Sequence, residues 1–209
     1  MSAALQRLCD GARSLDLDLA TDAAQRMLDY LALLRKWNRA YNLTAVTNTD
    51  AQVAAHLLDS LSIAPFINGD SVADVGSGAG LPGIPLALAQ PQKRFTLIDS
   101  RAKRTRFLRE AVRVLALENV TIVQDRVEDY RPPERFATVV ARAFAALPKM
   151  LDLSGHLLAE GGEIVAMKGR DPSAEVDAIP AQWRVIAVEG LSVPGLTAQR
   201  HVVRVVRTR

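Results

Sequence analysis

Cysteine is nearly absent from this sequence, and the other residues that commonly bind metals are few. Cys9 is the single cysteine in 209 residues, so an internal disulfide and a thiolate-rich zinc site are both excluded. The three histidines, His56, His156 and His201, are scattered without metal-ligand spacing. The scarcity of cysteine and histidine favours a protein without a metal site. A single cysteine also suits a reducing compartment, so we expect a cytoplasmic protein.

Long apolar runs are missing as well. No run approaches the roughly 20 apolar residues that cross a bilayer, and the first eleven residues lack the pattern of a secretory signal. Hydrophobic residues nevertheless make up 49% of the chain, which is enough for a sizeable core. The formal net charge of +3 permits a polyanionic partner without requiring one. We therefore expect one soluble domain with a modest extension and no membrane partner.

Two hydrophobic patterns divide the chain. From about residue 15 to residue 66, apolar residues recur at helical spacing, and no strand pattern appears before residue 71. From residue 71 onward strands and helices alternate, which predicts a mostly parallel, doubly wound α/β sheet. The expected strands are 71–75, 95–98, 120–123, 137–141, 163–167, 184–188 and 201–206, and the expected helices are 81–89, 103–117 and 147–158. We predict a helical N-terminal cap, residues 1–68, on a Rossmann-like core, residues 69–209.

A glycine-rich segment follows the first expected strand. Gly76, Gly78 and Gly80 would let the backbone turn sharply and approach a ligand closely. The spacing of Gly78, Gly80 and Gly83 also matches the dinucleotide fingerprint, so a nicotinamide cofactor is an alternative. Asp74 favours S-adenosylmethionine, because a carboxylate there would repel a pyrophosphate but attract ammonium and sulfonium groups.

Charged residues follow the next three strands. Asp99 ends the second strand, where an acid can bind ribose hydroxyls; alternatively, it starts a turn before Ser100. Residues 124–129, after the third strand, should flank the adenine, although Asp129 better fits a solvated loop. Arg142 follows the fourth strand and should pair with a carboxylate, either of the protein or of the methionine end of the cofactor.

Several motifs between residues 37 and 169 occur in a specific combination. They are Tyr41-Asn42-Leu43-Thr44-Ala45, His56-Leu57-Leu58-Asp59-Ser60-Leu61, the glycine segment from Asp74 to Pro85, Leu97-Ile98-Asp99-Ser100, Lys103-Arg104, Arg142-Ala143-Phe144 and Met167-Lys168-Gly169. This combination resembles the glucose-inhibited division protein B or RsmG-type small-subunit rRNA methyltransferases. The resemblance implies a class I methyltransferase fold with S-adenosylmethionine as cofactor. It also implies methylation of N7 of a single guanine in 16S rRNA, position 527 by the family's convention.

Carried over residue by residue, the resemblance implies cofactor contacts at Gly76, Leu81, Val127, Glu128 and Arg142. Guanine N7 carries a lone pair and no proton, so its methylation needs no general base. We therefore assign no catalytic acid or base, and expect the rate to come from alignment and exclusion of water.

Other types of RNA methylation leave marks that this chain lacks. Methylation of cytosine C5 uses a cysteine nucleophile, but Cys9 lies far upstream of every expected site segment. The Asn/Asp-Pro-Pro-aromatic element typical of exocyclic-amine methylases is replaced by Ala141-Arg142-Ala143-Phe144. Both differences agree with N7 chemistry.

Basic side chains suggest where RNA would bind. Lys103, Arg106 and Arg109 lie largely on one side of the helix after the second strand, although a solvated helix face is the ordinary explanation for each. Lys168 is the strongest candidate, because the end of the fifth strand borders the expected site.

Two polar positions in the N-terminal part have more than one interpretation. Asn42 either holds the loop between helices through side-chain to backbone hydrogen bonds or recognises a base. His56 and Asp59 are expected to form an interior polar pair that ties the cap to the core, and a direct catalytic role of His56 is the alternative.

Three other functions stay open on the residues alone: an NAD-dependent oxidoreductase, a catalytically silent RNA-binding module and a methyltransferase acting on a small molecule. The charge pattern indicates a polyanion, and only the resemblance specifies 16S rRNA or the small ribosomal subunit as the partner.

Overall fold

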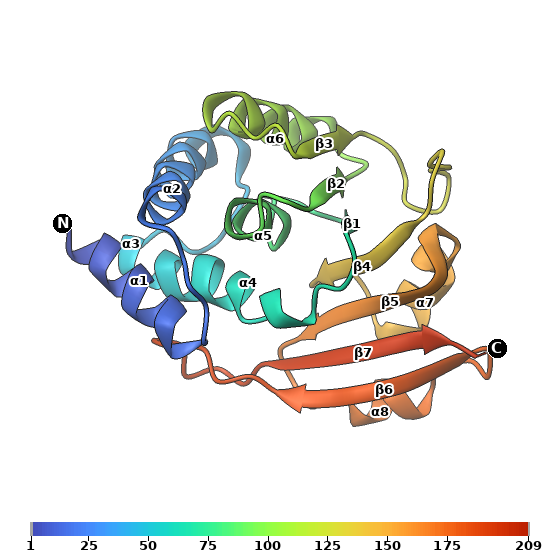
Figure 1. Cartoon of the computed structure of the whole chain (residues 1–209). Coiled ribbons are helices and arrows are strands. Elements are labelled where there is room, and N and C mark those ends of the chain that lie inside the picture. Colours follow the sequence, from blue (N-terminus) through green and yellow to red (C-terminus); the bar gives the residue numbers. More distant parts are fainter. Residues whose placement is uncertain (1, 209) are drawn as a thin grey trace.

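The structure, a computed structural model, describes residues 2–208 and contains a seven-stranded sheet. The strand order is β3-β2-β1-β4-β5-β7-β6 (Figure 1). The strands are β1 (Ser71–Val75), β2 (Arg94–Ile98), β3 (Val120–Val123), β4 (Phe136–Arg142), β5 (Leu158–Lys168), β6 (Trp183–Gly190) and β7 (His201–Arg207). Strands β1 to β5 run parallel, whereas β7 is antiparallel to both β5 and β6. The strand order reverses between β1 and β4, and such a switch point is where open α/β sheets bind ligands.

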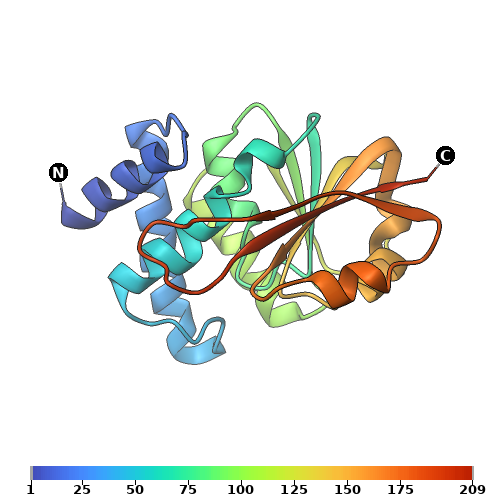
Figure 2. The same ribbon diagram turned by 90° about the horizontal axis from the view of Figure 1, so that it is seen from below.

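Helices cover both faces of the sheet. Helices α5 (Gly83–Ala89) and α6 (Ala102–Val114) share one face with the N-terminal helices, and α7 (Leu147–Ser154) and α8 (Ser173–Asp177) cover the other (Figure 2). Alternate strand residues face opposite layers: Val72 is buried with the first set of helices and Ala73 with the second. This alternation is why the strands are apolar on both sides.

The N-terminal helices share one hydrophobic core with the sheet. They are α1 (Ala3–Ser14), α2 (Thr21–Tyr41), α3 (Thr49–Gln52), a π-helical segment (Val53–Leu58) and α4 (Asp59–Leu61), followed by a 3-10 turn (Ala64–Phe66). Leu8, Leu31 and Leu57 are fully buried in the same cluster as Ile84 of α5 and Leu108 of α6. None of the helices described is both long and apolar enough to span a bilayer.

The α/β prediction is confirmed, and every expected strand is present. The helix expected over residues 147–158 ends at Ser154, and β5 begins at Leu158, before its expected start at residue 163. The N-terminal prediction is wrong at its start: helix α1 begins at Ala3, not near residue 15. Gly11 lowers helix propensity within α1, but its missing Cβ admits Leu58, whose methyl carbon would lie 2.5 Å from a Cβ at that position. Packing therefore decides where this helix forms.

Two further elements differ from the expected pattern. The helical pattern expected up to residue 66 contains the π-helical segment Val53–Leu58, and hydrophobic spacing gave no sign of it. Helix α8 is also additional, and none of its residues is fully buried, so it lacks the apolar periodicity that predicts a helix.

Candidate active site

The glycine loop after β1 is held in a conformation that suits glycine. Gly76, Gly78 and Gly80 have φ values of 69°, 60° and 92°, a region that side chains with a Cβ rarely adopt. A Cβ on Gly78 would have only the Gly76 carbonyl oxygen nearby, at 3.8 Å, so this residue borders open space. The loop thus presents backbone to a cavity, as a close-binding ligand requires.

Gly80 and Gly83 of the segment serve packing. A Cβ on Gly80 would lie 2.6 Å from Ile84 and 2.9 Å from Leu108, inside the core. A Cβ on Gly83 would meet the Asp74 carboxylate at 2.6 Å. Gly80 and Gly83 therefore allow α5 to pack closely on the sheet, and the dinucleotide-like spacing has a structural explanation.

Asp74 lies beneath the loop and is fully buried. Its Oδ2 accepts a hydrogen bond from the Gly83 N–H at 3.0 Å, while Oδ1 has no partner among residues 2–208. Burial raises the pKa of Asp74 to about 7, although the hydrogen bonds from Gly83 and Ser77 and the positive charge of Arg142 oppose this. Asp74 lines none of the cavities described below, so direct contact with a cofactor remains a prediction for this residue.

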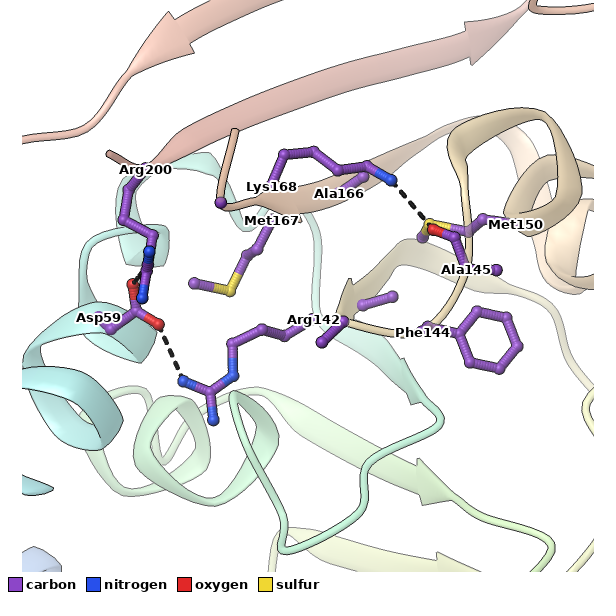
Figure 3. A pocket seen from close by; sticks show the side chains of 12 residues that line it. Asp59, Arg142, Phe144, Ala145, Met150, Ala166, Met167, Lys168 and Arg200 are labelled. Carbon is purple, nitrogen blue, oxygen red and sulfur yellow. Dashed lines mark hydrogen bonds and ion pairs between the residues drawn. The ribbon is translucent and has the colours of Figure 1, made fainter. Parts of the chain in front are cut away.

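Three adjoining cavities follow the carboxyl edge of the parallel strands, across the switch point. The first, of about 320 Å³, includes Gly76, Asp99, Val127 and Glu128 in its lining, and the second, of about 190 Å³, includes Gly76, Gly78, Leu81, His56 and Arg142. The third, of about 370 Å³, lies between the ends of β4 and β5 and includes Arg142, Phe144, Met167, Lys168 and Arg200 (Figure 3). The structure thus brings together most of the residues predicted to bind the cofactor.

Ala143 lines all three cavities and joins them. Its φ of 51° lies in the left-handed region, which costs a residue with a Cβ about 1 kcal/mol. Strained backbone of this kind is concentrated at functional sites.

Asp99 forms the predicted turn, and its contact with a ribose stays a prediction. It is almost fully buried, its Oδ1 accepts the Arg101 N–H at 2.9 Å, and its Oδ2 accepts the Gly78 N–H at 3.0 Å and an Arg104 N–H at 3.1 Å. The bond to Arg101 is the expected turn. A carboxylate has about four acceptor positions, so one remains for a ligand hydroxyl in the first cavity.

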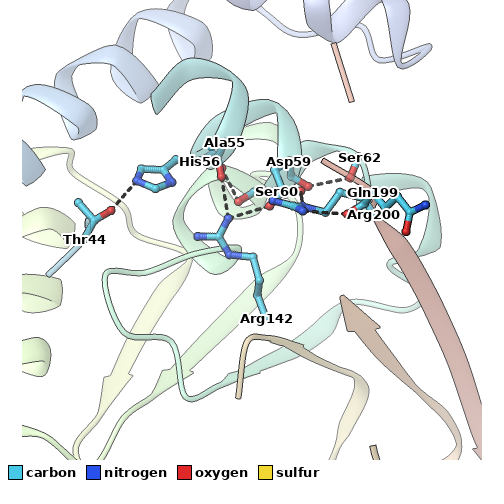
Figure 4. A network of polar contacts seen from close by, with 9 residues as sticks. All are labelled: Thr44, Ala55, His56, Asp59, Ser60, Ser62, Arg142, Gln199 and Arg200. Atoms are coloured by element: carbon cyan, nitrogen blue, oxygen red, sulfur yellow. Dashed lines mark hydrogen bonds and ion pairs between the residues drawn. The ribbon is translucent and has the colours of Figure 1, made fainter. Parts of the chain in front are cut away.

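The polar pair expected between His56 and Asp59 is wrong, although both side chains are buried at the site. The π-helical segment directs them to different partners (Figure 4). His56 Nε2 lies 2.9 Å from Thr44 Oγ1, whereas Asp59 forms ion pairs with Arg142 and Arg200, both at 2.8 Å. Burial lowers the pKa of His56, which favours its neutral form. The carboxylate expected beside Arg142 is therefore one of the protein's own.

The predicted RNA-binding residues fall into two groups. Lys168 is in the wall of the third cavity, where its ammonium donates to the Ala145 carbonyl at 3.0 Å and to Glu175 at 2.7 Å. Three side chains lie on the exposed face of α6, namely Lys103, Arg106 and Arg109.

Asn42 is exposed and ends α2 with a φ of 51°. The loop that follows is held by Asn38, whose side chain bonds both the N–H and the carbonyl of Thr44 at 2.9 Å. The loop-holding role therefore belongs to Asn38, and base recognition by Asn42 remains a prediction.

Two residues of the site were missed by the sequence analysis. Tyr30 of α2 is fully buried and donates its hydroxyl to the Ala79 carbonyl in the glycine loop, at 2.7 Å. Arg200, just before β7, reaches Asp59 across 141 positions of sequence. Tyr30 lies within the helical pattern of the N-terminal part, which does not mark it as a site residue, and no local pattern distinguishes Arg200 from the chain's other arginines.

The parallel sheet with an antiparallel β7, and the glycine loop at the switch point, define the class I methyltransferase fold. Similar solved structures include the glycopeptide N-methyltransferase MtfA complexed with S-adenosylmethionine, which is 13% identical with a TM-score of 0.60, covering 74% of this chain and 88% of that one. Another is TrmN from Thermus thermophilus, 20% identical with a TM-score of 0.56, covering 83% of this chain and 53% of that one. These likenesses show the fold.

The chain belongs to the GidB family, rRNA small subunit methyltransferase G, whose model matches residues 23–203. It is 48% identical over 201 residues to a ribosomal RNA small subunit methyltransferase G from Marinobacter nauticus, covering 96% of this chain and 94% of that protein. The protein of the same name from Coxiella burnetii is 48% identical over 200 residues, covering 96% of this chain and 97% of its own length. The family resemblance found in the sequence is confirmed, and the chain is a methyltransferase.

Proposed function

We propose that this enzyme transfers a methyl group from S-adenosylmethionine to N7 of one guanine, position 527 by the family's convention, in 16S rRNA of the small ribosomal subunit. The observation that carries the proposal is the row of adjoining cavities, in which a cofactor-sized part with the glycine loop and Asp99 opens into a part lined by cations. Family membership supports the ribosomal substrate. Such a substrate implies a cytoplasmic enzyme.

The residues of the first two cavities fit S-adenosylmethionine. Gly78 leaves room that a Cβ would fill, and Asp99 has an acceptor position for a ribose hydroxyl. Val127 and Glu128 would flank the adenine, and Arg142 keeps N–H groups for the carboxylate of the methionine part. The remaining proposed cofactor residues are Asp74, Gly76, Gly80 and Leu81. When bound, the cofactor supplies a methyl group on a positively charged sulfur.

The chain's own residues bind, align and exclude water, and none is required to move a proton. His56 is the titratable imidazole nearest the glycine loop, but its Nε2 is engaged with Thr44 and burial disfavours its charged form. Guanine N7 has no proton to remove, so this neutral histidine suits the reaction. The rate should therefore show no requirement for one ionised protein group once the substrate is bound.

RNA contacts are proposed for Lys168 in the wall of the third cavity, for Asn42 at the end of α2, and for Lys103, Arg106 and Arg109 on α6. The α6 residues are exposed cations on one helix face, which suits phosphate groups. Lys168 is different, because its ion pair with Glu175 fixes it at the cavity wall.

The proposal is tested by methyl transfer to small ribosomal subunits that lack the modification. Purified enzyme is incubated with radiolabelled S-adenosylmethionine and the subunits, the RNA is digested, and the labelled base is identified. Label in 7-methylguanine at a single position is the expected result. Label in another base or only in a small molecule, despite cofactor binding, would refute the proposed substrate.

A further inference from the structure

The third cavity is placed to receive whatever accepts the methyl group. It shares Arg142 and Ala143 with the second cavity and Ala143 and Phe144 with the first. A ligand in it would thus adjoin a ligand of the glycine loop. A larger cavity, of about 1200 Å³, is lined by residues such as Arg135, Gly161 and Arg184 and shares no lining residue with these three.

The lining of the third cavity combines apolar surface with positive charge. Phe144, Met150 and Met167 provide aromatic and polarisable surface, and Arg142, Lys168 and Arg200 provide cations (Figure 3). A flat heteroaromatic base suits the first group, and a phosphate suits the second. A volume of about 370 Å³ is within the range of small-ligand sites.

One buried carboxylate fixes both guanidinium groups. Asp59 Oδ2 pairs with Arg142 and Oδ1 with Arg200, each at 2.8 Å, and the Asp59 side chain is only 2% exposed (Figure 4). Two positive charges thus share one negative charge, and within residues 2–208 neither arginine has another acidic partner. One positive charge is left over at the cavity, which favours an anionic ligand.

Arg200 also has hydrogen-bond donors to spare. Its Nε donates to Asp59 and its Nη1 to the Gln199 carbonyl at 2.8 Å, while Nη2 has no protein partner in the described part of the chain. An arginine that is already anchored loses less freedom when it binds a phosphate than a free surface arginine would.

We propose that the third cavity holds the target nucleotide, turned out of the RNA, with its base against Met167 and Phe144 and a phosphate on Arg200. The inference rests on the proposed function, since it assigns the acceptor of that same reaction. Enzymes that modify a base commonly extrude it from the stack into such a pocket. Asp59 is then a positioning residue, because it orients Arg142 toward the cofactor and Arg200 toward the nucleotide.

The test compares nucleotide binding by two arginine variants of the full chain saturated with S-adenosylhomocysteine. Arg204 is the matched control: it lies in β7, four residues after Arg200, and also pairs with a buried acid, Glu163, but it does not line the cavity. Calorimetry would measure the affinities of guanosine and of its 5′- and 3′-monophosphates for the wild type, Arg200→Gln and Arg204→Gln. Glutamine keeps a donor for the acid in each variant and removes the charge.

We expect the wild type to bind the better monophosphate roughly ten-fold or more tightly than guanosine, as for a hydrogen-bonded charge pair. That ratio should fall toward one in Arg200→Gln and persist in Arg204→Gln, and the affinity for S-adenosylhomocysteine should stay within about two-fold in both. In turnover, Arg200→Gln should raise the KM for ribosomal subunits at least ten-fold.

Several results would overturn the assignment. The first two are a ratio of monophosphate to guanosine affinity that is unchanged in Arg200→Gln, and a ratio that falls equally in Arg204→Gln. The others are monophosphates that fail to bind or to compete with ribosomal subunits, and an affinity for S-adenosylhomocysteine that falls in Arg200→Gln as much as the affinity for the monophosphate. Failure of the proposed function is seen separately, because the wild-type enzyme would then place no label in guanine. Label in guanine with an unchanged ratio would remove only the nucleotide assignment.

Discussion

The hydroxyl of Tyr30 offers a sharp test of how the N-terminal helices support the cofactor loop. Tyr30 is fully buried in α2, and its hydroxyl donates to the Ala79 carbonyl at 2.7 Å. Burial raises the pKa of Tyr30, so the hydroxyl keeps its proton throughout the physiological range. Tyr30→Phe removes this donor, keeps the ring that packs against Phe107, and leaves the carbonyl of a buried residue without a partner.

The expected cost follows from that unsatisfied carbonyl. Leaving a buried acceptor unpaired costs about 1–3 kcal/mol, and each kcal/mol lowers the Tm of a chain of this size by roughly 2–4 °C. If the freed loop leaves its binding conformation part of the time, the affinity for S-adenosylhomocysteine falls by the same fraction, up to roughly ten-fold. Denaturant unfolding and calorimetric titration measure the two effects.

Tyr41→Phe is the matched control for Tyr30→Phe. It deletes a hydroxyl whose one hydrogen bond in the described part of the chain is the 3.4 Å interaction with Arg106 at the surface, so it should change stability by less than about 0.5 kcal/mol. Equal effects of the two substitutions, or a Tyr30→Phe protein as stable as the wild type, would refute the idea that α2 holds the glycine loop through this bond.

Three further predictions concern the same site. Gly78→Ala should abolish most cofactor binding. Gly161→Ala is its control, because Gly161 has a similar φ of 72° and a Cβ there would meet no atom of the described chain. This control should lower stability by about 1 kcal/mol and leave the cofactor affinity unchanged in a titration. The pKa of Asp74, about 7 in the folded state, lies above its unfolded value of about 3.9, so the wild type binds the proton more tightly when folded and loses stability as pH rises from 4 to 7. Relative to Asp74→Asn, the wild type should therefore lose about 3 kcal/mol of unfolding free energy between pH 5 and pH 8 in denaturant titrations, and parallel pH profiles would contradict the burial argument. Lys168→Ala should weaken methylation of RNA while leaving cofactor affinity nearly intact. Lys149→Ala, which removes an exposed lysine paired with Asp152, should change neither quantity. An equal loss of RNA methylation and of cofactor affinity in Lys168→Ala would refute its RNA role.

Periodicity and strand-end residues were enough to predict the sheet and most of the cofactor site. Gly76, Asp99 and Glu128 each follow a strand, and parallel strands bring such residues to one edge whatever the details of packing. Sequence reasoning failed where long-range contacts decide. The partner of Asp59 could not be read from the neighbouring His56, because the π-helical turn separates their directions and Arg200 arrives from the far end of the chain.

The N-terminal helices, expected as a cap, supply part of the site. Tyr30 fixes the glycine loop, and Thr44 and His56 line the second cavity. Asp59 pairs with arginines from two other segments. Without Asp59, these two guanidinium groups would lie close together with no acidic partner among residues 2–208. Because like charges at such a site repel, the geometry that joins the cofactor and acceptor cavities depends on a residue outside the Rossmann-like core.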